Sequence, residues 1–168
     1  MTALEVVTLV TAIVGAVTGT GALVWGVSQY LLTGPRVKVN IKEARLGMGG
    51  YVSGPGSWRT DDPQFFEPML AVEVVNHGRA PTTVEAVAIR FANKIEYRDL
   101  DSYGGANKST PHRLEEHSSA TWLIDLRAAQ ATVDVSTRVL KQPDRRVWGR
   151  ASLSTGKTVL STSTINVP

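Results

Sequence analysis

Apolar and polar positions alternate in two different ways along the chain. Between Glu5 and Arg36 lie 30 residues without a formal charge, and most of them are apolar. Beyond Arg36 the period changes to two, with short apolar runs separated by Gly, Pro, Asn and Ser. A long continuous apolar run is typical of a membrane helix, whereas alternation is typical of half-buried strands. We therefore expect an N-terminal transmembrane α-helix in residues 1–35 and a β domain in residues 36–168.

The length of the first segment favours a retained membrane helix over two alternatives. A bilayer core of roughly 30 Å needs about 20 helical residues, so the run can span it with some tilt. A cleaved signal peptide begins with basic residues and has an apolar region of about 7–15 residues. Here no base precedes Glu5, and the run is longer. A buried helix this apolar needs a large core around it, whereas the remaining residues form a separate β pattern.

The charges that flank the apolar run predict its orientation. Four bases follow it closely and none precedes it: Arg36, Lys38, Lys42 and Arg45. Basic residues favour the cytoplasmic side, so we expect a single-pass protein of the inner membrane with the N-terminus outside and the C-terminal domain in the cytoplasm. Near the surface, each such base is attracted to anionic membrane lipid by ~1 kcal/mol.

Small residues in the membrane segment raise the question of helix association. Gly15 and Gly19 form a Gly-x-x-x-Gly pattern. Small residues four apart share a helix face and let another backbone approach closely. The pattern is compatible with a homo-oligomer formed through this helix; the alternative is that glycine is simply common in membrane helices.

Residues 36–168 predict about seven short strands. Alternation or continuous apolar character marks the strands, and turn residues separate them. The strands are expected near residues 37–41, 69–75, 82–91, 94–98, 120–126, 147–153 and 157–165. This is the pattern of an all-β, antiparallel β-sandwich. Leu126–Leu140 stays open, because its alanines favour helix while Val133 and Val135 favour strand.

Two segments, Gly47–Pro68 and Asp99–Pro111, are too long and too polar for simple hairpins. Loops of this length are often functional. Exposed aromatic residues anchor many interfaces. The first segment has four aromatic candidates for binding a partner: Tyr51, Trp58, Phe65 and Phe66. The alternative is that some of them fold back and close the end of the β domain.

Composition and motifs argue against several kinds of chemistry. The chain has no cysteine, which excludes disulfides, zinc-thiolate sites and cysteine nucleophiles. A net charge of +3 with interspersed signs does not indicate nucleic-acid binding. Ala151–Thr158 has the spacing of a phosphate-binding loop, but alanine replaces its first glycine and a strand pattern follows, so we expect a hairpin turn. We predict no catalytic, cofactor-binding or metal-binding residues, and no enzyme.

Two further motifs are incomplete. Asp99–Thr110 begins like a calcium loop but has Tyr103 and Thr110 where oxygen ligands are needed. His112 and His117 are five residues apart, whereas metal-binding histidine pairs on a helix are four apart. Both segments are better explained as surface chain.

The run from Ala71 to Val87, with its strand, Asn-x-Gly, Pro and Thr-Val, resembles bacterial immunoglobulin-like β-sandwiches. The run from Pro111 to Trp122 resembles the stretch leading into a later strand of such modules. The likeness covers about residues 68–165 and lacks the cysteine pair of antibody domains. Small membrane-anchored proteins of this layout occur in high-GC Gram-positive bacteria and their phages. The resemblance implies an immunoglobulin-like fold and transfers no site residues.

These patterns together lead to a functional hypothesis. We expect a membrane-anchored module that binds or scaffolds an unidentified protein partner at the inner membrane surface, without catalysis. One alternative is a phage-encoded structural protein of the virion or a host-takeover membrane protein. A second alternative is an enzyme with a cryptic site.

Overall fold

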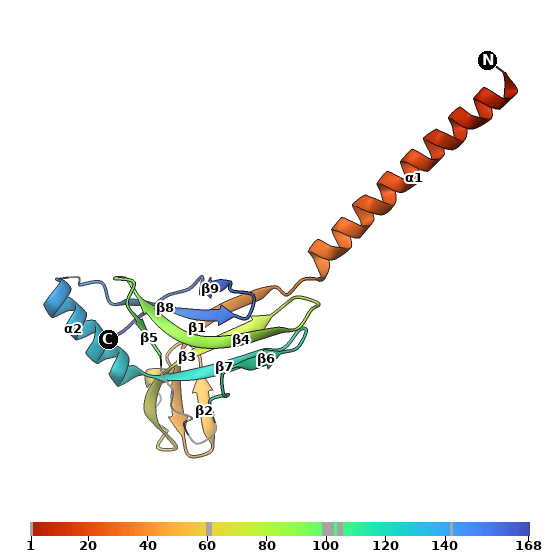
Figure 1. Ribbon diagram of the computed structural model, residues 1–168. Helices are drawn as coiled ribbons and strands as arrows, with labels where there is room; N and C mark the ends of the chain where they lie inside the picture. The colour runs from red at the N-terminus through yellow and green to blue at the C-terminus, as the bar shows by residue number, and fades with distance from the viewer. Residues whose placement is uncertain (1, 60–61, 99–102, 104–105, 142) are drawn as a thin grey trace. The chain divides into compact units, whose positions relative to one another are not determined.

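The computed structural model describes residues 2–59, 62–98, 103, 106–141 and 143–168, apart from the side chains of residues 30–32. The chain forms two compact units, Met1–Gly34 and Pro35–Pro168. The first is a single helix and the second is rich in antiparallel β-structure (Figure 1). An N-terminal apolar helix followed by antiparallel sheets, as predicted, is therefore confirmed.

The first unit is one uninterrupted helix, α1 (Ala3–Thr33). Thr2 caps it, because the Thr2 hydroxyl accepts from the Glu5 amide and the Glu5 carboxylate accepts from the Thr2 amide. Residues Ala3–Gln29 are long and apolar enough to cross a membrane, and none of this span's most apolar window is buried. Thr11 and Thr18 donate their hydroxyls to carbonyls one turn earlier, at 2.9 and 2.8 Å. The polar side chains thus satisfy themselves within the helix.

Within the described residues the second unit contains ten strands in two open sheets, with every pairing antiparallel. One sheet has the order β2-β1-β3-β7. Its strands are β1 (Val37–Gly47), β2 (Gly50–Ser53), β3 (Phe65–Asn76) and β7 (Ser119–Asp125). The other has the path β10-β8-β4-β5, with β6 pairing β4 and β9 pairing β8. Its strands are β4 (Thr82–Phe91), β5 (Glu96–Tyr97), β6 (His112–Leu114), β8 (Arg146–Leu153), β9 (Thr158–Leu160) and β10 (Ile165–Asn166).

The two sheets share one hydrophobic core. Alternate residues of β1, β3 and β7 face alternate residues of β4 and β8 across it. Gly149 of β8 lies close to the facing sheet. A Cβ added there would lie 3.1 Å from a methyl carbon of Val72 and 3.2 Å from one of Val39. Glycine is therefore the residue that this close approach accommodates.

A smaller cluster covers the opposite face of the four-stranded sheet. It consists of Ala44, Met69, Ala71 and Leu123, with Leu46, Tyr103 and Ala106 packed against it. The Asn107 side chain accepts from the Leu123 amide at 2.5 Å and donates to the Leu123 carbonyl at 2.9 Å. The Asn107 side chain thus makes the two hydrogen bonds that a neighbouring strand would make with Leu123. It does so at the β7 edge of the sheet, where backbone groups would otherwise be unpaired.

The segment that the sequence left open is a helix, α2 (Leu126–Leu140), at one end of the sheets (Figure 1). Asp125 caps it by accepting from the Arg127 amide at 2.8 Å. Its buried residues recur at helical spacing: Leu126, Ala129, Val133 and Ser136. Burial of this face outweighs the strand preference of the valines. Exposed Val135 and Val139 occupy the other side of the helix.

Three details differ from the sequence expectations. The described residues form ten strands where about seven short ones were expected. The Gly47–Pro68 segment is not one long loop, because β1 continues to Gly47 and turns back as β2. The strand expected at 157–165 is interrupted, because the Ser161 hydroxyl accepts from the Gly149 amide and donates to the Ser163 carbonyl. Both β9 and β10 pair with β8, and these side-chain bonds lie at the break between them.

Candidate functional site

Trp58, one of the four candidate aromatic residues, is part of the packed domain. It lies in the short 3₁₀ helix η1 (Ser57–Arg59) and is only partly exposed. Its indole Nε1 donates to the Met69 carbonyl at 2.9 Å, and its ring packs against the core. Trp58 therefore follows the alternative that some of these aromatics fold back against the domain.

The structure brings Tyr51 and Phe65 together and separates Phe66 from them. Tyr51 and Phe65 line a hollow of about 630 Å³, together with Met48 and Pro63. Phe65 and Phe66 are neighbours in a strand, so their side chains point to opposite faces, and Phe66 is 57% exposed. The four predicted residues therefore do not form a single aromatic surface.

Gly15 and Gly19 leave the surface of α1 open. A Cβ added at either position would meet no atom within 4 Å. The helix face that carries them therefore has room for a close neighbour, as the Gly-x-x-x-Gly pattern requires. Association of this helix with a second copy stays a prediction.

The four predicted membrane-surface bases lie just before β1 and along it, and they differ in environment. Arg36 and Lys38 are exposed. Lys42 forms an ion pair with Glu73 at 2.9 Å, and the hydrogen bond from Lys42 holds the pKa of Glu73 below its ordinary value. Arg45 donates to the Phe65 carbonyl at 3.0 Å. Nine residues of extended chain separate the first base from the last by roughly 30 Å, so they are not a single cluster.

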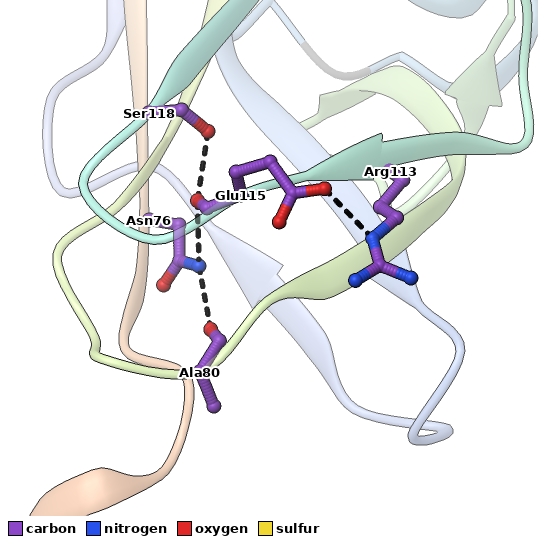
Figure 2. A network of polar contacts seen from close by, with 5 residues as sticks. All are labelled: Asn76, Ala80, Arg113, Glu115 and Ser118. Carbon is purple, nitrogen blue, oxygen red and sulfur yellow. Dashed lines mark hydrogen bonds and ion pairs between the residues drawn. The ribbon is translucent and has the colours of Figure 1, made fainter.

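Asn76 ties together three chain segments at the end of the domain where Arg36 lies. The Asn76 side-chain oxygen accepts from the Arg36 and Gly78 amides, at 3.3 and 3.0 Å. Its amide nitrogen donates to the Ala80 carbonyl at 2.8 Å and to the Glu115 carbonyl at 3.1 Å (Figure 2). The residue is fully buried, and each of its polar capacities is used. This network fixes the chain entry and two turns relative to one another.

The same end carries exposed surface interactions. The Ser118 hydroxyl donates to the Glu115 carbonyl at 2.7 Å, and Arg113 forms an ion pair with the Glu115 carboxylate at 2.8 Å (Figure 2).

The turn after β8 is a hairpin, as expected for Ala151–Thr158: the Gly156 amide donates to the Leu153 carbonyl, and β9 follows.

Sequence reasoning missed a group of charged and aromatic residues on the outer face of the six-stranded sheet. In β8, Val147, Gly149 and Ala151 are buried, so the intervening Arg146, Trp148 and Arg150 point away from the core. The Arg146 guanidinium lies 5.7 Å from the centre of the Trp148 ring. The alternation Arg-x-Trp-x-Arg is visible in the sequence and could have indicated this face.

Two neighbouring strands complete this face. Arg90 of β4 pairs with Trp148 on one side and with Glu96 of β5 on the other. Glu96 forms an ion pair with Arg150. We call the surface formed by Arg90, Glu96, Arg146, Trp148 and Arg150 the arginine–tryptophan face.

Arg146 also shows how a carboxylate binds at the arginine–tryptophan face. Its Nε lies 3.0 and 3.1 Å from the two Asp144 oxygens, and its Nη2 lies 2.6 Å from Oδ2. Hydrogen bonds from Arg146, first from its side chain and then from its backbone, lower the pKa of Asp144 to about 2. The same pair raises the pKa of Arg146. A guanidinium fork of this kind is well matched to carboxylates.

No three potential metal ligands gather among the residues that the structure describes. His112 contacts Trp122 edge to face, with ring centres 5.8 Å apart, and His117 is exposed in a turn. Of the Asp99–Thr110 segment, residues 99–102 and 104–105 lie outside the described residues.

No known protein-family model matches the chain. No curated protein sequence matches it either.

Proposed function

We propose that this protein is a single-pass membrane protein whose immunoglobulin-like β-sandwich holds a protein partner at the cytoplasmic surface of the inner membrane, without catalysis. The observation that carries the proposal is α1. It is long, apolar and exposed, and its threonines bond within the helix. Only three residues separate its end at Thr33 from the start of β1 at Val37.

The two units divide the work in this proposal. Apolar side chains that lie exposed along a whole helix are stabilised by lipid, since water would leave that surface unburied. The β unit has its own core and needs no support from the helix to bury its apolar residues. Confinement to a surface raises the effective concentration of the tethered module toward a partner in the same membrane. Arg36 and Lys38, both exposed, favour the cytoplasmic side.

Extraction with alkaline carbonate tests the anchor. The intact chain should stay with the membrane, and its N-terminal sequence should still contain the apolar segment. Val14→Arg should lower retention, since a central arginine costs about 2.5–3.5 kcal/mol on insertion. Val135→Arg, the same change at an exposed position of α2, should not. Release of the wild-type chain, or a mature chain that begins after the helix, refutes the anchor.

Topology and partner binding need separate measurements. A tag at the C-terminus should be protected from external protease in intact cells, and its digestion would refute the cytoplasmic orientation.

A photocrosslinker at Trp148 should capture a membrane-associated protein in native membranes. Capture should persist with a crosslinker at Arg150 and be absent at Arg127, an exposed residue of α2.

A further inference from the structure

The arginine–tryptophan face has the composition of a protein-binding surface. Trp and Arg are the residues that most often dominate interface energies, and here one tryptophan lies among three arginines. None of the five residues belongs to the core cluster between the sheets. Antiparallel sheets can leave one face toward water, and this one presents charged side chains there.

The charge on this face is unequal. Glu96 neutralises Arg150, and Asp144 neutralises Arg146. Among the described residues Arg90 has no ion-pair partner, although it lies between Trp148 and Glu96 in the register. Arg98, which is exposed, follows β5 directly and adds a further positive charge. The excess charge is therefore positive and lies beside the tryptophan.

We propose that the arginine–tryptophan face binds an acidic segment of the protein partner. Arg146 already holds the Asp144 carboxylate through two nitrogens, and Arg150 holds that of Glu96. Carboxylates are thus the groups that these guanidinium groups engage in the folded chain. Arg90 supplies the unneutralised charge, and the partner's own carboxylates complement it. The inference rests on the proposed function of a protein-binding module.

A nucleic acid or a lipid surface fits this face less well. Single-stranded nucleic acid stacks its bases on aromatic side chains along a basic groove. Here the face has one tryptophan, and the Arg146 guanidinium lies over its ring. An anionic bilayer would attract the bases, but exposed apolar anchors would have to enter the lipid, and Trp148 is only partly exposed.

Peptide binding to the full chain tests the inference. The protein is placed in nanodiscs of zwitterionic lipid, and the probe is a labelled peptide in which Glu alternates with Ser. Fluorescence anisotropy should show saturable binding that weakens with salt, and the same peptide with Gln for Glu should not bind. Arg90→Gln and Trp148→Ala should each weaken binding about tenfold, as expected for hot-spot residues.

Matched variants separate this face from other surfaces. Arg127→Gln makes the same charge change on α2, and Val139→Ala removes exposed apolar atoms from α2. Both should bind the peptide like the wild type. Trp148→Phe keeps an aromatic ring and should restore much of the affinity lost in Trp148→Ala. Circular dichroism melting of each variant establishes that it is folded.

Three outcomes overturn the inference. The first is no binding of the Glu peptide by a folded chain. The second is equal weakening by Arg127→Gln or Val139→Ala. The third is that the chain binds a labelled single-stranded oligonucleotide, or nanodiscs with anionic lipid, more tightly than it binds the Glu peptide. In that outcome Arg90→Gln and Trp148→Ala would abolish the tighter binding. Carbonate extraction tests the membrane anchor separately. A chain that stays with the membrane but does not bind the peptide therefore refutes only this inference.

Discussion

Replacement of buried Asn76 by leucine should destabilise the β unit strongly. Leucine has a similar volume but can neither accept from the Arg36 and Gly78 amides nor donate to the Ala80 and Glu115 carbonyls. The hydrogen bonds that Asn76 makes in the folded chain are therefore all lost at once.

The magnitude follows from the surroundings of the four partners. A net hydrogen bond contributes about 0.5–1.5 kcal/mol, and a partner left buried costs most. The Arg36 amide and the Glu115 carbonyl belong to exposed residues and can regain water, which places them at the low end. Gly78 is buried and Ala80 is partly buried, which places them at the high end. The sum is about 4 kcal/mol, a large part of a typical stability of about 5–15 kcal/mol.

Urea unfolding of the full chain in detergent micelles measures this loss. Tryptophan fluorescence reports the β unit, and in a separate thermal melt the melting temperature should fall by roughly 10–15 °C. Asn166→Leu, at an exposed position of β10, is the control and should stay within about 0.5 kcal/mol of the wild type. Asn76→Asp should lose stability as the pH rises, because an ionised carboxylate would face two carbonyl oxygens. A loss below about 1 kcal/mol for Asn76→Leu refutes the reasoning.

Three further predictions concern packing and charge. Gly149→Ala should destabilise the domain by about 1–3 kcal/mol in urea unfolding, since its Cβ would crowd two valine methyl carbons, and an unchanged midpoint would contradict the close approach of the sheets. Lys42→Met should raise the pKa of Glu73 toward its ordinary value in an NMR titration; the pair stabilises the fold above that value, and its contribution disappears as the pH falls through the lowered pKa. The Asp144 carboxyl should titrate at about 2 in the wild type and move upward in Arg146→Gln, so a midpoint that the variant leaves in place argues against their pairing.

Local patterns were sufficient to predict several elements. The strand expected at 82–91 is β4, with the same bounds. The helix expected from the charge-free run is α1. The open choice at Leu126–Leu140 was decided by packing, because the core needs the face that carries Ala129 and Val133. Propensity alone could not decide it, since alanine and valine gave opposite preferences.

Other features depended on contacts between distant residues. The Gly-rich stretch after Leu46 looked like a loop, yet β1 continues and pairs with β2 there. A Cβ at Gly47 would lie 2.1 Å from the Gln64 carbonyl oxygen. No local sequence pattern predicts this close approach of two chain segments. The Trp58 indole donates to the Met69 carbonyl, whereas Phe65 and Phe66 point to opposite faces of β3, so the aromatic candidates do not lie together. Burial of each aromatic ring depends on which strand lies beside it.

The sequence by itself determined the long apolar helix and the buried side of each main strand. A run without charge and an apolar–polar alternation of period two are local properties of the sequence. Each is sufficient to predict its element without knowledge of distant residues. Only the tertiary structure decided what Asn76 binds and that Arg90 and Glu96 join Trp148 on one surface. These groups come from strands far apart in the chain, and strand register places them together.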